Sequence, residues 1–388
     1  MKSFKYVNGT EIVFGSGALH QVGEITRRYG QRALLVTTPV VAYMQPLIDK
    51  ITARLTDSGV NVAFFDGVVP NPTTESITAG ARRAREFKAD VVIGFGGGSS
   101  MDTAKAIAVE ATHPGTAWDY LFFKQPPSAT TLPIIAITTT SGTGSHVTQV
   151  AVLSENDTKT KSAIYNDIIL PKVAIVDPSL MLTLPKSVTA MTGFDAFTHA
   201  FESMIHPATS PFIEMMAKEV IHIVINTLPL VLRNHQDLEL REKMAWADTL
   251  AGLCIKSAGV TLPHGQGMAI SGLFSHVAHG EALAIVYPAF IRFTWQSAIP
   301  AFAVLARELD PTLTKCPDNE AAEHSAQLMK AFLSEIGLNK TLRDVGMTEK
   351  EIPELAVASM LLPDYKGNPR IATSEEMIAL IKEAYYGA

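Results

Sequence analysis

A carboxylate and several imidazoles occur in the second half of the sequence at spacings that suit a metal ion. Asp195 and His199 are four residues apart in GFDAFTHAFES, so on a helix they share one face, with β-carbons about 5–6 Å apart. The later segment PHGQGMAISGLFSHVAHGE contributes His264, His276 and His279. A carboxylate with three imidazoles is a ligand set suited to a divalent ion such as Fe²⁺ or Zn²⁺. The alternative for each histidine taken alone is a hydrogen-bonded core residue.

Three consecutive glycines, Gly96, Gly97 and Gly98, follow the apolar run ADVVIGF and precede the helical pattern SSMDTAKAIAVEAT. Glycine lets a backbone pass close to a bulky anion, and the start of a helix presents unpaired N–H groups and a positive dipole end to a phosphate. We predict that this turn holds the pyrophosphate of a dinucleotide. The simpler interpretation is a strand-to-helix turn with Ser99 or Ser100 as the N-cap.

The usual dinucleotide fingerprint follows the first strand of its domain, where this sequence has VTTPVVAY and no glycine. The ordinary Rossmann pattern is therefore not met. A second polar loop, TTTSGTGS from Thr138 to Ser145, follows the apolar run LPIIAIT. Ligands of open α/β sheets bind at the carboxyl ends of the strands, so this loop, paired with the glycine turn, supports a dinucleotide site. Taken alone, it is also compatible with an ordinary loop.

These loops need a parallel sheet to position them, and the first half of the sequence has the pattern of one. Short runs rich in Val and Ile alternate with helical stretches up to KVAIVDP, which is typical of a doubly wound, Rossmann-like α/β domain. From about Pro185 onward, apolar residues recur at three- and four-residue spacing, which predicts helices. We therefore predict an α/β dinucleotide-binding domain at residues 1–185 and an all-helical, metal-binding and catalytic domain at residues 186–388.

The composition of the 388-residue chain, with 47% hydrophobic and 18% charged residues, is typical of a two-domain globular enzyme. The net charge of -6 comes from interleaved acidic and basic residues without a basic stripe, which argues against nucleic acid as a partner. The two cysteines, Cys254 and Cys316, predict no disulfide framework. We recognise neither a signal peptide nor an uncharged apolar run of membrane-spanning length, so we expect a cytoplasmic protein without a membrane partner.

Four motifs resemble, in order and spacing, those of the iron-containing, or group III, alcohol dehydrogenases of the dehydroquinate synthase-like superfamily. They are GGGSSMDTAK, TTTSGTGS, GFDAFTHAFES and PHGQGM followed by VAHGEALAIVYP, and together the resemblance covers essentially the whole chain. It implies the dehydroquinate synthase-like fold, with the active site in the cleft between the two domains. It also implies one Fe²⁺, or alternatively Zn²⁺, with the ligands Asp195, His199, His264 and His279. The implied contacts to NAD or NADP are Gly97, Gly98, Ser99, Asp102, Thr139, Thr143, Val152 and Lys161.

Three positions depart from the family's pattern. Thr38 stands where many NAD-preferring relatives have an aspartate, so the charge that would repel a 2′-phosphate is missing and we expect both NAD and NADP to bind. His146 replaces a glutamate, and Met268 replaces a histidine four residues after the third metal ligand. We predict that His276, three residues before His279 on an expected helix, takes over part of the proton relay. The alternative is that His276 is structural or solvated.

The resemblance implies an enzyme that transfers a hydride between NAD(P) and a small alcohol or aldehyde, as a homodimer or larger homo-oligomer. One alternative is the superfamily's lyase branch, which eliminates phosphate from a sugar acid. Few lysines or arginines lie near the metal motifs to bind such a phosphate. The other alternative is a nucleotide-binding relative without catalysis, which the loss of a metal ligand would indicate. All four ligand positions carry the expected residue types.

Overall fold

The computed structural model describes residues 3–42, 44–157 and 160–387 and divides the chain into two compact units. One unit is Val7–Leu182, and the other combines Met1–Tyr6 with Thr183–Ala388. The ring of Tyr6 packs edge-on against Phe212, with a centroid distance of 4.6 Å. The described residues before Val7, which we predicted to belong to the α/β domain, therefore lie with the helical unit.

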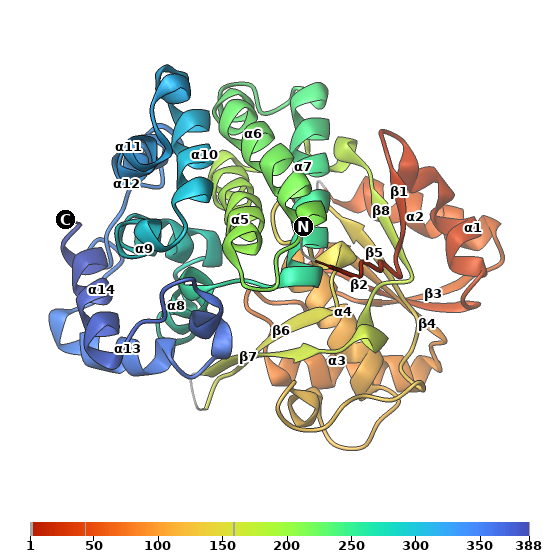
Figure 1. The fold of residues 1–388 in the computed structure, drawn as a ribbon. Helices are drawn as coiled ribbons and strands as arrows, with labels where there is room; N and C mark the ends of the chain where they lie inside the picture. Colours follow the sequence, from red (N-terminus) through yellow and green to blue (C-terminus); the bar gives the residue numbers. More distant parts are fainter. Residues whose placement is uncertain (1–2, 43, 158–159, 388) are drawn as a thin grey trace. The chain divides into compact units, whose positions relative to one another are not determined.

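The first unit is built on a six-stranded parallel sheet with the strand order β1-β8-β5-β4-β2-β3 (Figure 1). Its strands are β1 Glu11–Phe14, β2 Arg32–Val36, β3 Asn61–Phe65, β4 Val91–Gly96, β5 Ile134–Thr138 and β8 Val173–Val176. Strands β4, β5 and β8 coincide with the apolar runs ADVVIGF, LPIIAIT and KVAIVDP, whereas β1 is a strand that we did not predict. A separate antiparallel pair, which we did not predict, is formed by β6 Val150–Glu155 and β7 Thr160–Tyr165.

Helices cover both faces of the sheet because successive side chains along a strand point to opposite sides. Leu34 of β2 packs in one core cluster with Ile107 of helix α4, whereas its neighbour Leu35 packs in another with Ile51 of helix α2. The covering helices are α1 Val22–Arg27, α2 Gln45–Asp57, α3 Thr74–Phe87 and α4 Gly98–Glu110. The predicted doubly wound α/β fold is therefore confirmed.

The second unit is helical throughout its described residues, apart from loops and short 3₁₀ turns. Its α-helices are α5 Lys186–Ile205, α6 Pro211–Arg233, α7 Leu238–Ala258, α8 Leu262–Leu273, α9 His279–Thr294, α10 Ile299–Leu309, α11 Asp318–Glu323, α12 Ser325–Glu335, α13 Ile352–Ser359 and α14 Ser374–Tyr386. Helix α5 packs against α6, α7 and α9. The predicted combination of an α/β unit with an all-helical unit is confirmed.

An aromatic cluster holds α5 against α9. Phe194 and Phe197 of α5 stack with a centroid distance of 5.6 Å, and the ring of Tyr287 from α9 meets Phe194 edge-on at 5.3 Å. All three side chains are fully buried. Edge-to-face and offset-stacked rings at such distances contribute about 0.5–1.5 kcal/mol each beyond their area burial. The cluster therefore fixes the two helices that carry most of the predicted metal ligands.

Helix α6 is, among the described residues, the helix long and apolar enough to cross a membrane when judged by length and composition alone. Half of its most apolar 18-residue stretch is buried in the structure, and Val220, Ile221 and Val224 belong to the core. The helix packs against α5 and α7. A buried core helix passes the same length and composition test.

Candidate active site

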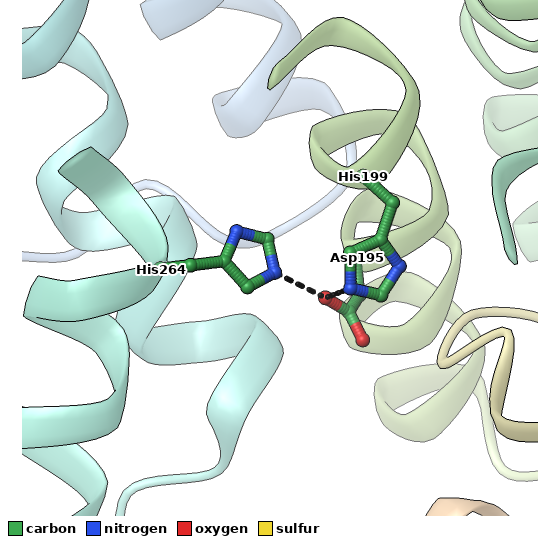
Figure 2. A group of neighbouring side chains, drawn as sticks. All are labelled: Asp195, His199 and His264. Atoms are coloured by element: carbon green, nitrogen blue, oxygen red, sulfur yellow. Dashed lines mark ion pairs between the residues drawn. The ribbon is translucent and has the colours of Figure 1, made fainter. Parts of the chain in front are cut away.

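Three helices bring the predicted metal ligands together. Helix α5 places Asp195 and His199 one turn apart on the same face, α8 supplies His264 as its third residue, and α9 begins with His279. Ligand atoms of Asp195, His199 and His264 all lie within 4.8 Å of one another. Figure 2 shows the ring of His264 facing the two side chains of α5.

The imidazoles surround one carboxylate oxygen. Oδ1 of Asp195 lies 3.5 Å from Nε2 of His199 and 3.8 Å from Nε2 of His264. Nε2 of His279 lies 4.0 Å from the same oxygen. Ligand bonds of about 2.1 Å in a tetrahedral site separate two ligand atoms by about 3.4 Å, so Asp195, His199 and His264, whose ligand atoms all lie within 4.8 Å of one another, have about the spacing that ligands of one ion require.

The surroundings of His264 test whether these residues suit a cation. Its Nδ1 lies 2.8 Å from Oε1 of Glu202, and because an ionised carboxylate only accepts hydrogen bonds, Nδ1 is the donor. Its Nε2 is buried and has no hydrogen-bond partner among the described residues. Burial disfavours the imidazolium, yet Glu202 and Asp195 outweigh burial and raise the pKa of His264. The two carboxylates therefore favour a positive charge at this site, which a divalent ion would supply.

In the α/β unit, the predicted cofactor residues gather at one edge of the sheet. Strands β2, β4 and β5 are parallel neighbours, so the loops after them meet at their carboxyl ends. Thr38 follows β2, the glycine turn follows β4, and Thr139 follows β5. The N–H of Thr139 donates to the carbonyl oxygen of Gly96 at 2.9 Å. The two loops proposed from sequence to share a dinucleotide are thus in direct contact.

The glycine turn leads straight into helix α4. Gly97 is the N-cap residue, and no side chain caps the helix, so the interpretation with Ser99 or Ser100 as the N-cap is wrong. Gly96 has a φ of 142°, in the region that favours glycine. A β-carbon on Gly98 would lie 2.8 Å from the methyl group of Thr143, so the neighbouring loop closes over the turn. The first turn of α4 therefore has the uncapped N–H groups that a phosphate requires.

Three of the residues carried over as cofactor contacts have partners inside the chain. Oδ1 of Asp102 accepts from the hydroxyl of Ser145 at 2.6 Å, and its Oδ2 accepts from the N–H of Val152 at 3.1 Å. Lys161 donates to Oδ1 of Asn71 at 2.9 Å. Asp102 therefore ties α4 to β6 and to the loop after β5. Direct contact of these residues with a cofactor stays a prediction.

Lys105 is a fully buried lysine of α4 that we did not predict as a functional residue. Its Nζ donates to the carbonyl oxygens of Ser145, Thr148 and Val150 at 2.7–2.9 Å, which fixes the loop beside the glycine turn. Burial lowers the pKa of Lys105 to about 8. Burial, followed by the charge of Lys105, lowers the pKa of His146 to about 3, so this imidazole is neutral at physiological pH. A lysine within the apolar run AKAIAV was the signal available in the sequence.

Comparison with known families matches both units. The iron-containing alcohol dehydrogenase family matches residues 9–178, and the C-terminal part of the same family matches residues 189–385. The chain belongs to the iron-containing alcohol dehydrogenase family.

Relatives within this iron-containing alcohol dehydrogenase family cover nearly the whole chain. The 1,3-propanediol dehydrogenase of Klebsiella pneumoniae is 32% identical over 386 residues, covering 99% of both chains. The NADPH-dependent butanol dehydrogenase of Clostridium saccharobutylicum is 30% identical over 387 residues, covering 97% of both. An archaeal halo-thermophilic alcohol dehydrogenase from a Red Sea brine pool is 32% identical in sequence, and its crystal structure matches with a TM-score of 0.93. The match covers 99% of this chain and 100% of that chain. The predicted family and alcohol dehydrogenase activity are confirmed, and these relatives give no support to the lyase and non-catalytic alternatives.

The prediction that His276 and His279 lie three residues apart on one helix is wrong for this alcohol dehydrogenase. Helix α8 ends at Leu273 and α9 begins at His279, so His276 lies in the exposed turn between them. Its Nε2 donates to the carbonyl oxygen of Val345 at 2.9 Å, because a carbonyl can only accept. Only Nδ1 remains to take a proton, and a relay through His276 stays a prediction.

Gly280→Ala is expected to destabilise the helical unit by about 1–3 kcal/mol, the usual range for overpacking. A β-carbon on Gly280 would overlap the backbone carbonyl of Met191 in α5, and backbone cannot move aside as a side chain can. Helix α9 must then shift, taking His279 away from Asp195. Urea unfolding and a metal titration measure the two effects.

Gly9→Ala is the matched control, because its β-carbon would meet only the end of the Leu170 side chain, at 3.1 Å. We expect the control to change stability by less than about 0.5 kcal/mol. Native stability and native metal affinity in Gly280→Ala would show that the close approach of α9 to α5 does not position His279.

Proposed function

We propose that this alcohol dehydrogenase oxidises small alcohols, and reduces the corresponding aldehydes, with NAD or NADP and one Fe²⁺ ion. The arrangement of histidine Nε2 atoms around Oδ1 of Asp195 is the observation that carries this proposal. The residues that would hold the ion are Asp195, His199, His264 and His279, and Zn²⁺ suits the same donors. When bound, such an ion supplies Lewis acidity that lowers the pKa of an alcohol hydroxyl.

The ligand set supports this use of the ion. Asp195 is the one anionic residue among the four, and the three histidines are neutral when they ligate, so the four ligands compensate half of the charge of a divalent ion. A bound nicotinamide coenzyme would supply the hydride acceptor for oxidation of the alcohol, which also releases one proton. In the α/β unit, the glycine turn and the loop containing Thr139 would hold the dinucleotide that accepts the hydride.

Short alcohols are proposed as substrates because relatives along the whole chain are named for 1,3-propanediol and for butanol. Formation of reduced nicotinamide, followed by its absorbance, tests the proposal with a panel of short alcohols and both coenzymes. The protein is first stripped with a chelator and then reloaded with Fe²⁺ or Zn²⁺. We expect turnover only after reloading. Equal activity in the stripped protein, or no alcohol oxidised with either metal, would contradict the proposal.

We predict weak discrimination between NAD⁺ and NADP⁺, because Thr38 lies after β2 at the cofactor edge without a negative charge. Thr38→Asp is expected to shift the ratio of kcat/KM values toward NAD⁺ by at least about tenfold, because a carboxylate repels the 2′-phosphate. Thr38→Asn is the matched control, because asparagine has the shape of aspartate without its charge. It should leave the ratio of kcat/KM values for the two coenzymes near the native one. A native preference above about a thousandfold for either coenzyme would contradict this prediction.

We also propose that the protein acts in the cytoplasm, as a homodimer or a larger homo-oligomer, without nucleic acid or a membrane as a partner. Cys254 is buried and Cys316 is partly buried, and both are free thiols, which suits a reducing compartment. The oligomeric state is proposed from the family resemblance. Light scattering of the purified protein tests it, and a monomer at micromolar concentration would contradict it.

A further inference from the structure

Glu202 is a buried carboxylate that lies on the same face of α5 as two of the proposed ligands. It is three residues after His199 and seven after Asp195, and these spacings stack side chains along one side of a helix. Its exposed fraction is 0%. Burying a carboxylate destabilises a fold unless both of its oxygens are hydrogen-bonded, so Glu202 must have hydrogen-bond partners inside the protein.

Both carboxylate oxygens of Glu202 are bonded to the start of α8. Oε1 accepts from Nδ1 of His264 at 2.8 Å. Oε2 accepts from the backbone N–H of Thr261 at 2.7 Å and from its hydroxyl at 3.2 Å. Thr261 is the N-cap residue of α8, and its side chain makes no cap hydrogen bond to that helix. Glu202 therefore holds the N-terminus of α8, where a negative charge is also favoured by the helix dipole.

These hydrogen bonds determine the tautomer of His264 and the orientation of its ring toward Asp195. Because Nδ1 of His264 carries a proton and donates it in the hydrogen bond to Glu202, Nε2 of the neutral ring has a lone pair. Nε2 is the atom that lies 3.8 Å from Oδ1 of Asp195. The opposite tautomer would place a proton on Nε2, and this atom could then not ligate an ion. The bond to Glu202 also fixes the angle of the ring, because the backbone of Thr261 anchors the other oxygen of the carboxylate.

We propose that Glu202 is the positioning residue of the metal centre: it holds His264 with Nδ1 protonated and Nε2 toward Asp195, and it thereby sets the affinity for the ion. The proposal rests on the proposed metal centre. Carboxylates that orient ligating histidines in this way are worth about 10–100-fold in metal affinity. The competing explanation is that Glu202 only stabilises the junction between α5 and α8.

Glu202→Gln separates the two explanations, because glutamine keeps the shape but cannot accept from both partners. With its amide nitrogen toward Thr261, two donors face each other. With the nitrogen toward His264, the imidazole must accept at Nδ1 and carry its proton on Nε2. In either orientation the Kd for Co²⁺, measured by competition with a chelator on stripped protein, is expected to rise about 10–100-fold. Nitrogen-15 spectra of the stripped protein are expected to lose the Nδ1–H signal of His264 in the second orientation and to keep it in the first.

Glu110→Gln is the matched control in the α/β unit. Glu110 is also buried, and its Oε2 accepts from the N–H of Ala117 at 2.8 Å. This control is expected to lower stability while leaving the Kd for Co²⁺ unchanged. A Glu202→Gln protein that is less stable, yet binds Co²⁺ with the native Kd, would overturn the positioning role and leave the metal centre intact. A native protein that binds no Co²⁺ would overturn the metal centre, and the role of Glu202 with it.

Thr261→Val decides the question if Glu202→Gln does not fold. Valine keeps the size and the backbone N–H of Thr261 and removes only the hydroxyl that donates to Glu202. We expect the Kd for Co²⁺ to rise about fivefold, the equivalent of one hydrogen bond. An unchanged Kd in this variant would overturn the proposal.

Discussion

Replacement of His264 by alanine is expected to remove the bound metal and the activity together. His264 is buried, supplies an Nε2 atom to the proposed centre, and is the hydrogen-bond donor to Oε1 of Glu202. Loss of the ion removes several kcal/mol of charge stabilisation from the reaction, so kcat/KM is expected to fall about 10³-fold or more. Elemental analysis of the purified protein and kcat/KM with one short alcohol measure both losses.

His222→Ala is the matched control for this experiment, because it removes an exposed histidine of the same unit. Nδ1 of His222 lies 3.0 Å from the carboxylate of Glu308 at the surface, where an ion pair is worth about 0–1 kcal/mol. We expect it to retain its metal and its activity. A His264→Ala protein with the native metal content and the native kcat/KM would rule out His264 as a ligand.

Gly97→Val is expected to raise the Kd for the coenzyme by more than about tenfold, or 1.4 kcal/mol. A β-carbon on Gly97 would lie 3.1 Å from the methyl group of Thr140, so a branched side chain fills the space between the two loops. That space is where the proposed pyrophosphate would meet the N-terminus of α4. Titration calorimetry of the metal-loaded protein with NAD⁺ and NADP⁺ gives the Kd.

Ala111→Val is the matched control, because Ala111 caps the opposite end of the same helix. It adds the same side chain to α4 and is expected to leave the coenzyme Kd unchanged. The metal content of Gly97→Val reports whether the helical unit is intact. An unchanged coenzyme Kd in a folded, metal-loaded Gly97→Val protein would place the pyrophosphate elsewhere.

The strands and the helix carrying the first two ligands were predictable because they depend on neighbours in the sequence. Apolar runs such as the one around Ile93 form strands wherever both faces are buried, and the four-residue spacing of Asp195 and His199 makes them neighbours on any α-helix. Strand β1 escaped prediction because its four residues gain their partner from β8, across more than half of the α/β unit. The pairing of β6 with β7 was also missed, although the two strands are close in the sequence.

By itself, the sequence determined the α/β and helical halves, the glycine turn and the residue types of a metal centre, because periodicity and side-chain chemistry are local properties. Only the tertiary structure decided which atoms meet. Three Nε2 atoms surround Oδ1 of Asp195 because α8 and α9 pack beside α5, whereas His276, in similar local sequence, falls in a turn. The role of Glu202 was also hidden, because its partners His264 and Thr261 lie about sixty residues away and reach it only when α8 docks.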